Sequence, residues 1–124
     1  MIIAVDFDGT CVTHAYPEIG RDIGAIPVLQ EMVRASHDLI LFTMRSGEPL
    51  AEAILWFDEH QIPLYGVNSN PTQHEWTSSP KAYAGLYIDD AALGCPLLYE
   101  DGNRPYVNWI KARELLERRG VFSG

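Results

Sequence analysis

The stretch IIAVDFDGT, residues 2–10, places two aspartates, Asp6 and Asp8, directly after a short apolar run. Residues 2–5 form a continuous run rich in β-branched side chains, which is typical of a strand that is covered on both faces. Side chains two positions apart on a strand point the same way, so both carboxylates emerge on one side if the extended conformation continues to Asp8. Because two like charges held this close repel each other, the stretch predicts a compensating group nearby.

The rest of the chain alternates strand and helix patterns. Further strands are predicted at residues 39–43, 64–67, 86–90 and 96–99, and helices at residues 25–36, 48–60 and 105–120, the last with Pro105 in its first turn. This order implies right-handed crossovers and a mostly parallel sheet with helices on both faces. The chain has 124 residues, about the size of one domain, so we take residues 1–124 as a single domain. We therefore predict a single α/β domain.

Apolar positions at helical spacing predict the buried faces of two helices. In the helix at residues 48–60 these positions include Ile54 and Phe57, and in the C-terminal helix they include Ile110 and Leu115. Trp56 and Trp109 also lie in helical patterns, and we expect them to pack in the core.

Composition limits the partners that the chain can bind. Its formal net charge is −8, from 17 acidic and 9 basic side chains, which argues against a surface for long nucleic acid but leaves a local phosphate site open. No apolar run approaches the ~18 residues of a membrane span, and no signal peptide precedes Asp6, so no membrane association is expected. Cys11 and Cys95 lie far apart, which favours reduced thiols in a cytoplasmic protein, although spacing alone leaves a disulfide open.

Polar residues follow three of the predicted strands: Asp6 and Asp8 the first, Thr43 the second, and Asp89 and Asp90 the fourth. In parallel sheets, ligands bind beyond the carboxyl ends of the strands. Mg²⁺ prefers oxygen ligands, is commonly held by one or two carboxylates, and would offset the repulsion between them. Aspartate also acts as a nucleophile through aspartyl-phosphate, and a second carboxyl beside it can serve as general acid and base.

Four segments together resemble the motifs of the haloacid dehalogenase superfamily, in their order: DFDGT, LFTMR, Lys81 and YIDD. The resemblance covers roughly residues 2–95 and is closest to small, capless, phosphatase-like bacterial members. It implies a Rossmann-like three-layer sandwich, dependence on Mg²⁺ and hydrolysis of phosphomonoesters. Larger relatives insert a cap domain at two places, where this chain has roughly 15 and 13 residues, too few for a separate cap domain.

The resemblance also assigns roles to the acidic residues. Asp6 resembles the nucleophile, and Asp8 resembles the general acid and base, with its backbone carbonyl as a metal ligand. Asp89 and Asp90 match the acidic pair, of which at least one binds the metal. The metal-binding set implied by the resemblance is therefore Asp6, Asp8, Asp89 and Asp90. For Asp89 and Asp90 the alternative is a helix N-cap followed by an acidic first turn.

A second set of residues is expected to bind phosphate. Thr43 matches the hydroxyl that binds the transferring phosphoryl group, together with the backbone N–H groups of Met44 and Arg45. Lys81 matches the basic residue that neutralises phosphate, with the Arg45 side chain as its rival. Gly9 suits a tight turn next to a ligand. The alternatives are an ordinary strand-end threonine and a solvated surface lysine.

Three further side chains have two interpretations each. His14 either faces the substrate or, as we expect, is a solvent-exposed loop histidine. His74 and Trp76 either stack on a ring of the substrate or, as we expect, pin the loop at residues 68–80.

These observations predict a capless, Mg²⁺-dependent phosphatase with an open site, walled by residues 11–22 and 68–80. Its substrate is a phosphorylated small molecule, screened by loops or by a second subunit of a homo-oligomer, or the accessible end of a macromolecule. The alternative is a catalytically silent relative or a receiver-like module that binds phosphate and metal. A receiver needs its phosphoacceptor on the third strand, where LYGVNSN, residues 64–70, contains no acid.

Overall fold

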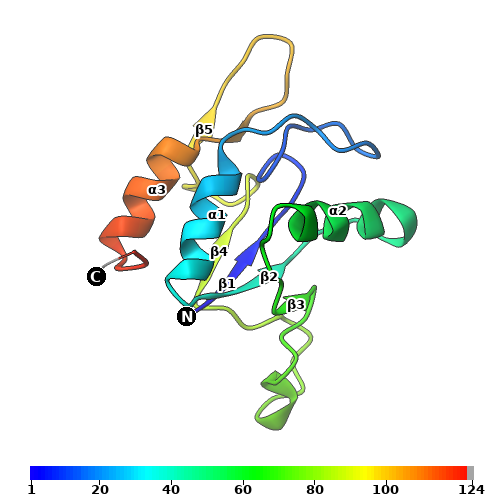
Figure 1. The fold of residues 1–124 in the computed structure, drawn as a ribbon, viewed down its shortest axis with the longest axis vertical. Coiled ribbons are helices and arrows are strands. Elements are labelled where there is room, and N and C mark those ends of the chain that lie inside the picture. Colours follow the sequence, from blue (N-terminus) through cyan, green and yellow to red (C-terminus); the bar gives the residue numbers. More distant parts are fainter. Residues whose placement is uncertain (123–124) are drawn as a thin grey trace.

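The computed structural model describes residues 1–122 and has a four-stranded parallel sheet at its centre (Figure 1). The strands lie in the order β3-β2-β1-β4 and comprise β1 (Ile2–Val5), β2 (Asp38–Leu41), β3 (Gly66–Val67) and β4 (Leu86–Ile88). The register pairs Val5 with Leu41 on one side and with Ile88 on the other. Because these three strands end side by side, the residues that follow them meet at one edge of the sheet. The predicted α/β class with a mostly parallel sheet is confirmed.

The three α-helices pack on one face of this sheet. They are α1 (Ala25–Arg34), α2 (Gly47–Glu59) and α3 (Trp109–Arg118), and their buried residues share one core cluster with Ile3 and Leu39 of the strands. The opposite face carries a smaller cluster of Ala4, Ile40 and Ala84. Helices were expected on both faces. The structure differs because the connection between β3 and β4 contains only a short 3-10 helix, η1 (Gln73–Glu75).

A two-stranded antiparallel hairpin lies outside the central sheet. Its strands are β5 (Leu97–Leu98) and β6 (Tyr106–Val107). The expectation that the C-terminal helix includes Pro105 in its first turn is therefore wrong. Residues 106–107 pair with β5 instead, and α3 begins only after Asn108, whose side chain accepts a hydrogen bond from the Lys111 N–H at 3.1 Å. This is a normal side-chain N-cap.

Several strands are shorter than predicted. Strand β2 ends at Leu41, so Thr43 lies beyond the strand, and β4 ends at Ile88, so both following aspartates lie in a turn. Thr43, Asp89 and Asp90 therefore stand on the loops that leave the sheet, beyond the last residues of their strands.

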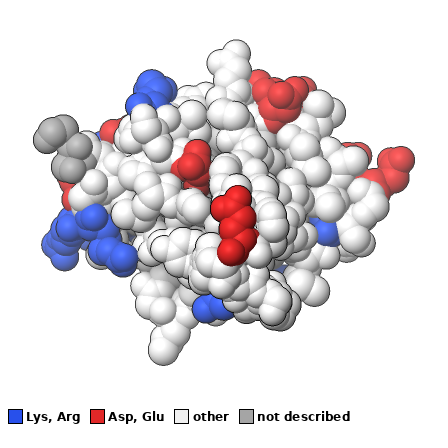
Figure 2. Space-filling model, turned by 90° about the horizontal axis from the view of Figure 1, so that it is seen from below, with Lys and Arg blue, Asp and Glu red and all other residues white. Residues whose placement is uncertain are grey.

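Within residues 1–122, no helix combines the length and the apolar character that crossing a membrane requires. The face shown in Figure 2 has most of its basic side chains gathered at one side, with acidic side chains elsewhere on it. No broad basic surface covers that face.

Candidate active site

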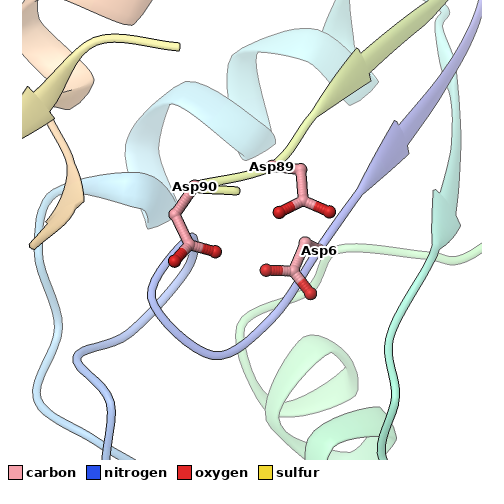
Figure 3. A group of neighbouring side chains, drawn as sticks. All are labelled: Asp6, Asp89 and Asp90. Carbon is pink, nitrogen blue, oxygen red and sulfur yellow. The ribbon is translucent and has the colours of Figure 1, made fainter. Parts of the chain in front are cut away.

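Asp6 lies at the end of β1, opposite the two aspartates that follow β4. Its backbone N–H donates to the Ile88 carbonyl at 3.0 Å and so extends the pairing of β1 with β4 by one residue. Figure 3 shows the carboxylates of Asp6, Asp89 and Asp90 turned toward one another. One oxygen atom of each carboxylate lies within 4.8 Å of the others. The structure thus brings together three of the four predicted acidic residues.

The turn after β4 tests the alternative role of the acidic pair. The Asp89 carboxylate accepts the Ala91 N–H at 2.8 Å, which closes a turn of residues 89–91. No helix begins there, so neither aspartate is a helix N-cap.

Thr10, the last residue of the opening stretch, connects the two sides of the acidic cluster. Its buried hydroxyl lies 2.8 Å from an Asp6 oxygen and 3.2 Å from an Asp90 oxygen, and it accepts the Asp90 N–H at 3.0 Å. The Thr10 carbonyl in turn accepts the indole N–H of Trp109 at 2.7 Å. Thr10 therefore holds Asp6 and Asp90 in a fixed relation, and α3 holds Thr10.

The charge of this cluster is not balanced by protein cations. Burial raises the pKa of Asp6 from 3.8 to about 8, and the hydrogen bond with Asp90 and the negative charge of Asp89 act in the same direction. In the described part of the chain, no lysine or arginine forms an ion pair with any of the three aspartates, and His14 is the one basic side chain paired with any of them. Three converging carboxylates without a protein counter-charge fit a hard divalent cation.

His14 is fixed against Asp90. Its Nε2 atom lies 3.1 Å from an Asp90 oxygen and 3.2 Å from the Pro105 carbonyl. Because both partners are acceptors, Nε2 carries the proton. The expectation of a solvent-exposed histidine is wrong, since only 14% of the side chain is exposed.

Gly9 makes room for this histidine. Its φ is +81°, and a Cβ atom at this position would overlap the His14 ring and lie 2.7 Å from an Asp90 oxygen. The tight turn predicted at Gly9 is therefore present. The space beside it is filled by His14 and not left for a phosphate.

Asp8 points away from the acidic cluster and forms a two-bonded ion pair with Arg45. The guanidinium donates to both Asp8 oxygens at 2.8 Å, and to the carbonyls of Pro17, Glu18 and Pro49 at 3.1, 2.7 and 3.0 Å. These bonds occupy all five N–H donors of the side chain, which is 1% exposed. As placed, Arg45 has no donor left for a phosphate, and its evident role is to position Asp8.

Thr43 borders a hollow of about 240 Å³ together with Asp6, Phe42, Met44, Asn68 and Asp89. The Asn68 side chain accepts the Thr43 N–H at 2.7 Å, and the Thr43 hydroxyl accepts the Arg45 N–H at 3.1 Å. The predicted phosphate-binding threonine and the predicted nucleophile thus face the same hollow. Asn68 lies at the start of the predicted wall at residues 68–80, but no individual role was predicted for it.

Lys81 lies outside that hollow. Its ammonium group sits 5.3 Å from the centre of the Tyr87 ring, which itself packs against Phe42 with ring centres 6.2 Å apart. Among the described residues, Lys81 forms no ion pair with these carboxylates, and its ammonium group lies over an aromatic ring instead.

Of the predicted wall at residues 68–80, only Asn68 lines a hollow at this edge of the sheet. Figure 1 shows why: the segment with η1 extends away from the carboxyl ends of the strands. Within it, Trp76 packs edge-on against Tyr83, and the His74 ring lies 3.0 Å from the Pro71 carbonyl. These contacts fit the loop-pinning interpretation of His74 and Trp76.

A second hollow, of about 620 Å³, shares one lining residue, Met44, with the first. It is lined by Asp8, His14, Ala15, Tyr16, Met44, Arg45 and Arg104. Of the predicted wall at residues 11–22, three residues, His14, Ala15 and Tyr16, line this hollow, and the hairpin residue Arg104 lines it as well. Met44 lines both hollows, so the hollow at Asp6 and the hollow at Asp8 meet at this residue.

One comparison with known proteins identifies a relative. The chain is 37% identical to a conserved protein from Bacteroides thetaiotaomicron whose structure is known, with a TM-score of 0.75. The match covers 96% of this chain and 91% of that chain. This chain belongs to the same family as that Bacteroides protein. No family model and no curated protein matches the chain.

The sequence contained a signal for two of the three site residues that had no predicted role. Thr10 stands within the opening motif itself, and Asn68 lies at the start of the predicted wall at residues 68–80. Arg104 follows the last motif by many residues, in a segment without any pattern that points to the site.

Proposed function

We propose that this chain is a Mg²⁺-dependent phosphomonoester hydrolase of the haloacid dehalogenase type, which acts through an aspartyl-phosphate on Asp6. The observation that carries the proposal is the pair of adjoining hollows. Asp6 faces the hollow bordered by Thr43, and Asp8 faces the neighbouring one. A phosphomonoester that spans both has its phosphoryl group at Asp6 and its leaving group beside Asp8.

The acidic cluster is suited to hold the metal. Asp6, Asp89 and Asp90 supply the converging oxygen atoms, and the Asp8 side chain is turned toward Arg45. When bound, Mg²⁺ supplies positive charge that keeps Asp6 ionised and offsets the charge of the phosphoryl oxygens. The raised pKa of Asp6, about 8, supports this need for a cation.

In the first step, an Asp6 carboxylate oxygen forms a bond to phosphorus while the bond from phosphorus to the leaving oxygen breaks. In the second step, water attacks the aspartyl-phosphate, releases inorganic phosphate and restores Asp6. We call the hollow of about 620 Å³ beside Asp8 the leaving-group hollow. Because its carboxyl group lines this hollow, Asp8 is the group that exchanges protons with the leaving oxygen and then with water. To donate a proton it has to be released from at least one of its bonds to Arg45.

Two groups next to Asp6 are suited to the phosphoryl oxygens. The Thr43 hydroxyl accepts the Arg45 N–H and keeps its own proton for donation. Met44 lines the same hollow, and its backbone N–H is the second of these groups. Such preorganised donors stabilise charge that develops in the transition state. Lys81 contributes only at longer range.

The test is release of phosphate from a generic aryl phosphate, with and without Mg²⁺. Asp6→Asn should abolish release while the urea unfolding curve still shows a cooperative fold. Asp58→Asn, the same substitution on the exposed side of α2, serves as the control and should leave the rate unchanged. Unchanged hydrolysis in Asp6→Asn contradicts the proposed mechanism.

The second candidate is a catalytically silent module that binds phosphate and metal. The observation in its favour is the saturated Asp8–Arg45 pair, which occupies the group expected to move protons. This candidate predicts that Mg²⁺ and a phosphoryl analogue such as beryllium fluoride bind together, while a broad panel of phosphomonoesters stays intact. Turnover of any phosphomonoester by the purified protein rejects it.

We place the activity in the cytoplasm. Cys11 is buried, Cys95 is half-buried, and both are free thiols in the structure. This is the usual state of cysteines in a reducing compartment.

A further inference from the structure

The leaving-group hollow has an unbalanced positive charge. Asp8, Arg45 and His14 line it, but Asp8 and Arg45 neutralise each other, and His14 is bound to Asp90. Arg104 also lines the hollow, is exposed, and forms no ion pair with any residue that the structure describes. In a chain of net charge −8, an unpaired arginine at this place is a candidate ligand-binding group.

Hydrogen bonds of the residues on both sides of Arg104 fix the position of its backbone. Glu100 accepts hydrogen bonds from Arg21 and Asn103, each at 2.9 Å, and from the Tyr106 hydroxyl at 2.7 Å. These bonds tie the hairpin to the loop that carries residues 11–22.

On its other side, Arg104 is followed by Pro105, whose carbonyl lies 3.2 Å from His14 Nε2. Further along, the Val107 N–H donates to the Gly9 carbonyl at 3.0 Å. The backbone around Arg104 is therefore anchored to the loop that follows β1, at Gly9 and His14.

Two exposed apolar side chains flank the same hollow. Tyr16 is 61% exposed, and the centre of its ring lies 5.2 Å from the guanidinium carbon of Arg45. Met44 is 97% exposed and borders both hollows. Apolar side chains exposed beside a polar site provide contact area for the body of a ligand.

We infer that the substrate is a small phosphomonoester whose leaving group carries a second anionic group, bound by Arg104, with its apolar body between Tyr16 and Met44. This inference rests on the proposed function, because the proposed phosphoryl site at Asp6 defines which hollow receives the leaving group. The second anion is a carboxylate or another phosphate, since the guanidinium fork binds both with paired hydrogen bonds.

The test compares phenyl phosphate with para-carboxyphenyl phosphate and hydroquinone bisphosphate, which distinguishes a carboxylate from a second phosphate. We expect kcat/KM to be at least about tenfold higher for one of the two substrates with a second anion than for phenyl phosphate. Arg104→Gln should remove this preference, mainly through KM. Arg118→Gln, at the exposed end of α3, is the control and should keep it. Added salt should weaken the preference.

The outcomes separate the inference from the proposed function. If the wild-type protein hydrolyses all three compounds equally well, or if Arg104→Gln lowers all three rates alike, the inference is overturned and the proposed function stands. If nothing is hydrolysed, the proposed function fails, and calorimetric binding of the same compounds decides the inference. Weaker binding in Arg104→Gln for the compounds with a second anion alone supports the anion site, and equal binding overturns it.

Discussion

Without metal, the acidic cluster should make the folded protein less stable as the pH rises. The pKa of Asp6 is 3.8 in an unstructured chain and about 8 in the fold, so the folded state holds the Asp6 proton more tightly. The resulting stabilisation is fully present below about pH 4 and is lost as the pH rises through about 8. At about 1.4 kcal/mol for each pKa unit, the ceiling is about 6 kcal/mol. Since Asp6 is half-buried and interacts with Asp89 and Asp90, we expect about 3 kcal/mol.

The assay is urea unfolding in a metal chelator between about pH 5 and about pH 8.5. Asp6→Asn removes the titrating group and keeps an oxygen that can accept the Thr10 hydroxyl, so its stability should vary less with pH. The difference between the wild-type and Asp6→Asn curves isolates Asp6 from the other titrating groups. Asp58→Asn, on the surface of α2, should follow the wild-type curve.

Mg²⁺ should reverse the loss at high pH. A ligand that binds only the folded state stabilises it by about 2.7 kcal/mol at a concentration 100 times its dissociation constant. This gain should be large near pH 8.5 and small near pH 5, because protonated Asp6 is a poor ligand. If the free energies of unfolding of the wild type and Asp6→Asn run parallel within about 0.5 kcal/mol across the range, the reasoning is refuted.

Three further predictions follow from single contacts. Arg45→Met should lower the free energy of unfolding by about 3–5 kcal/mol, because it leaves the Asp8 carboxylate without its partner, and a loss below about 1 kcal/mol in urea unfolding would contradict this. Asp8→Asn should slow hydrolysis of an alkyl phosphate by about 100-fold or more and hydrolysis of an aryl phosphate much less, because an aryl leaving group departs without a proton. Equal slowing of both substrates in steady-state assays argues against a proton-transfer role of Asp8. Gly9→Ala should destabilise the fold more than Gly94→Ala. Both glycines have positive φ, but only at Gly9 would the added Cβ overlap the His14 ring. Equal unfolding midpoints of the two variants would show that the ring moves aside freely.

The sequence predicted the acidic cluster well because the sheet register brings its members together. Right-handed crossovers between these apolar runs predict parallel strands. In the structure Val5 pairs with both Leu41 and Ile88, which aligns the three strand ends. The convergence of Asp6 with Asp89 then follows without knowledge of any side-chain contact.

Periodicity located the helices but not all of their buried faces. Ile54 and Ile110 are 36% and 78% exposed, whereas Trp56 and Trp109 are buried, as expected for core tryptophans. Apolar residues three or four positions apart define one face of a helix. Whether that face meets the sheet depends on the rotation of the helix about its own axis, which the spacing does not give. Here the large aromatic side chains occupy the core, and isoleucines one or two positions away face outward.

The direction of side chains after a strand end was beyond sequence reasoning. Asp6 and Asp8 were expected on one side of an extended backbone, but β1 ends at Val5 and the Asp8 side chain turns to Arg45. Likewise, motif order suggested Lys81 as a phosphate ligand, whereas its ammonium group lies over the Tyr87 ring and does not line the hollow at Asp6. Motifs specify which residues are present along the chain, and loop paths decide which of them meet.

The C-terminal part of the chain, which contains none of the four motifs, holds the first motif in place. Trp109 binds the Thr10 carbonyl, Val107 binds the Gly9 carbonyl, and the Pro105 carbonyl binds His14. The same hairpin carries Arg104 into the leaving-group hollow. If the proposed function and the anion site at Arg104 hold, chemistry and substrate choice lie on different segments: the strand ends hold the acidic cluster, and the hairpin lines the hollow for the leaving group. A relative with the same strand ends and another hairpin should keep the reaction and change the leaving group that it accepts.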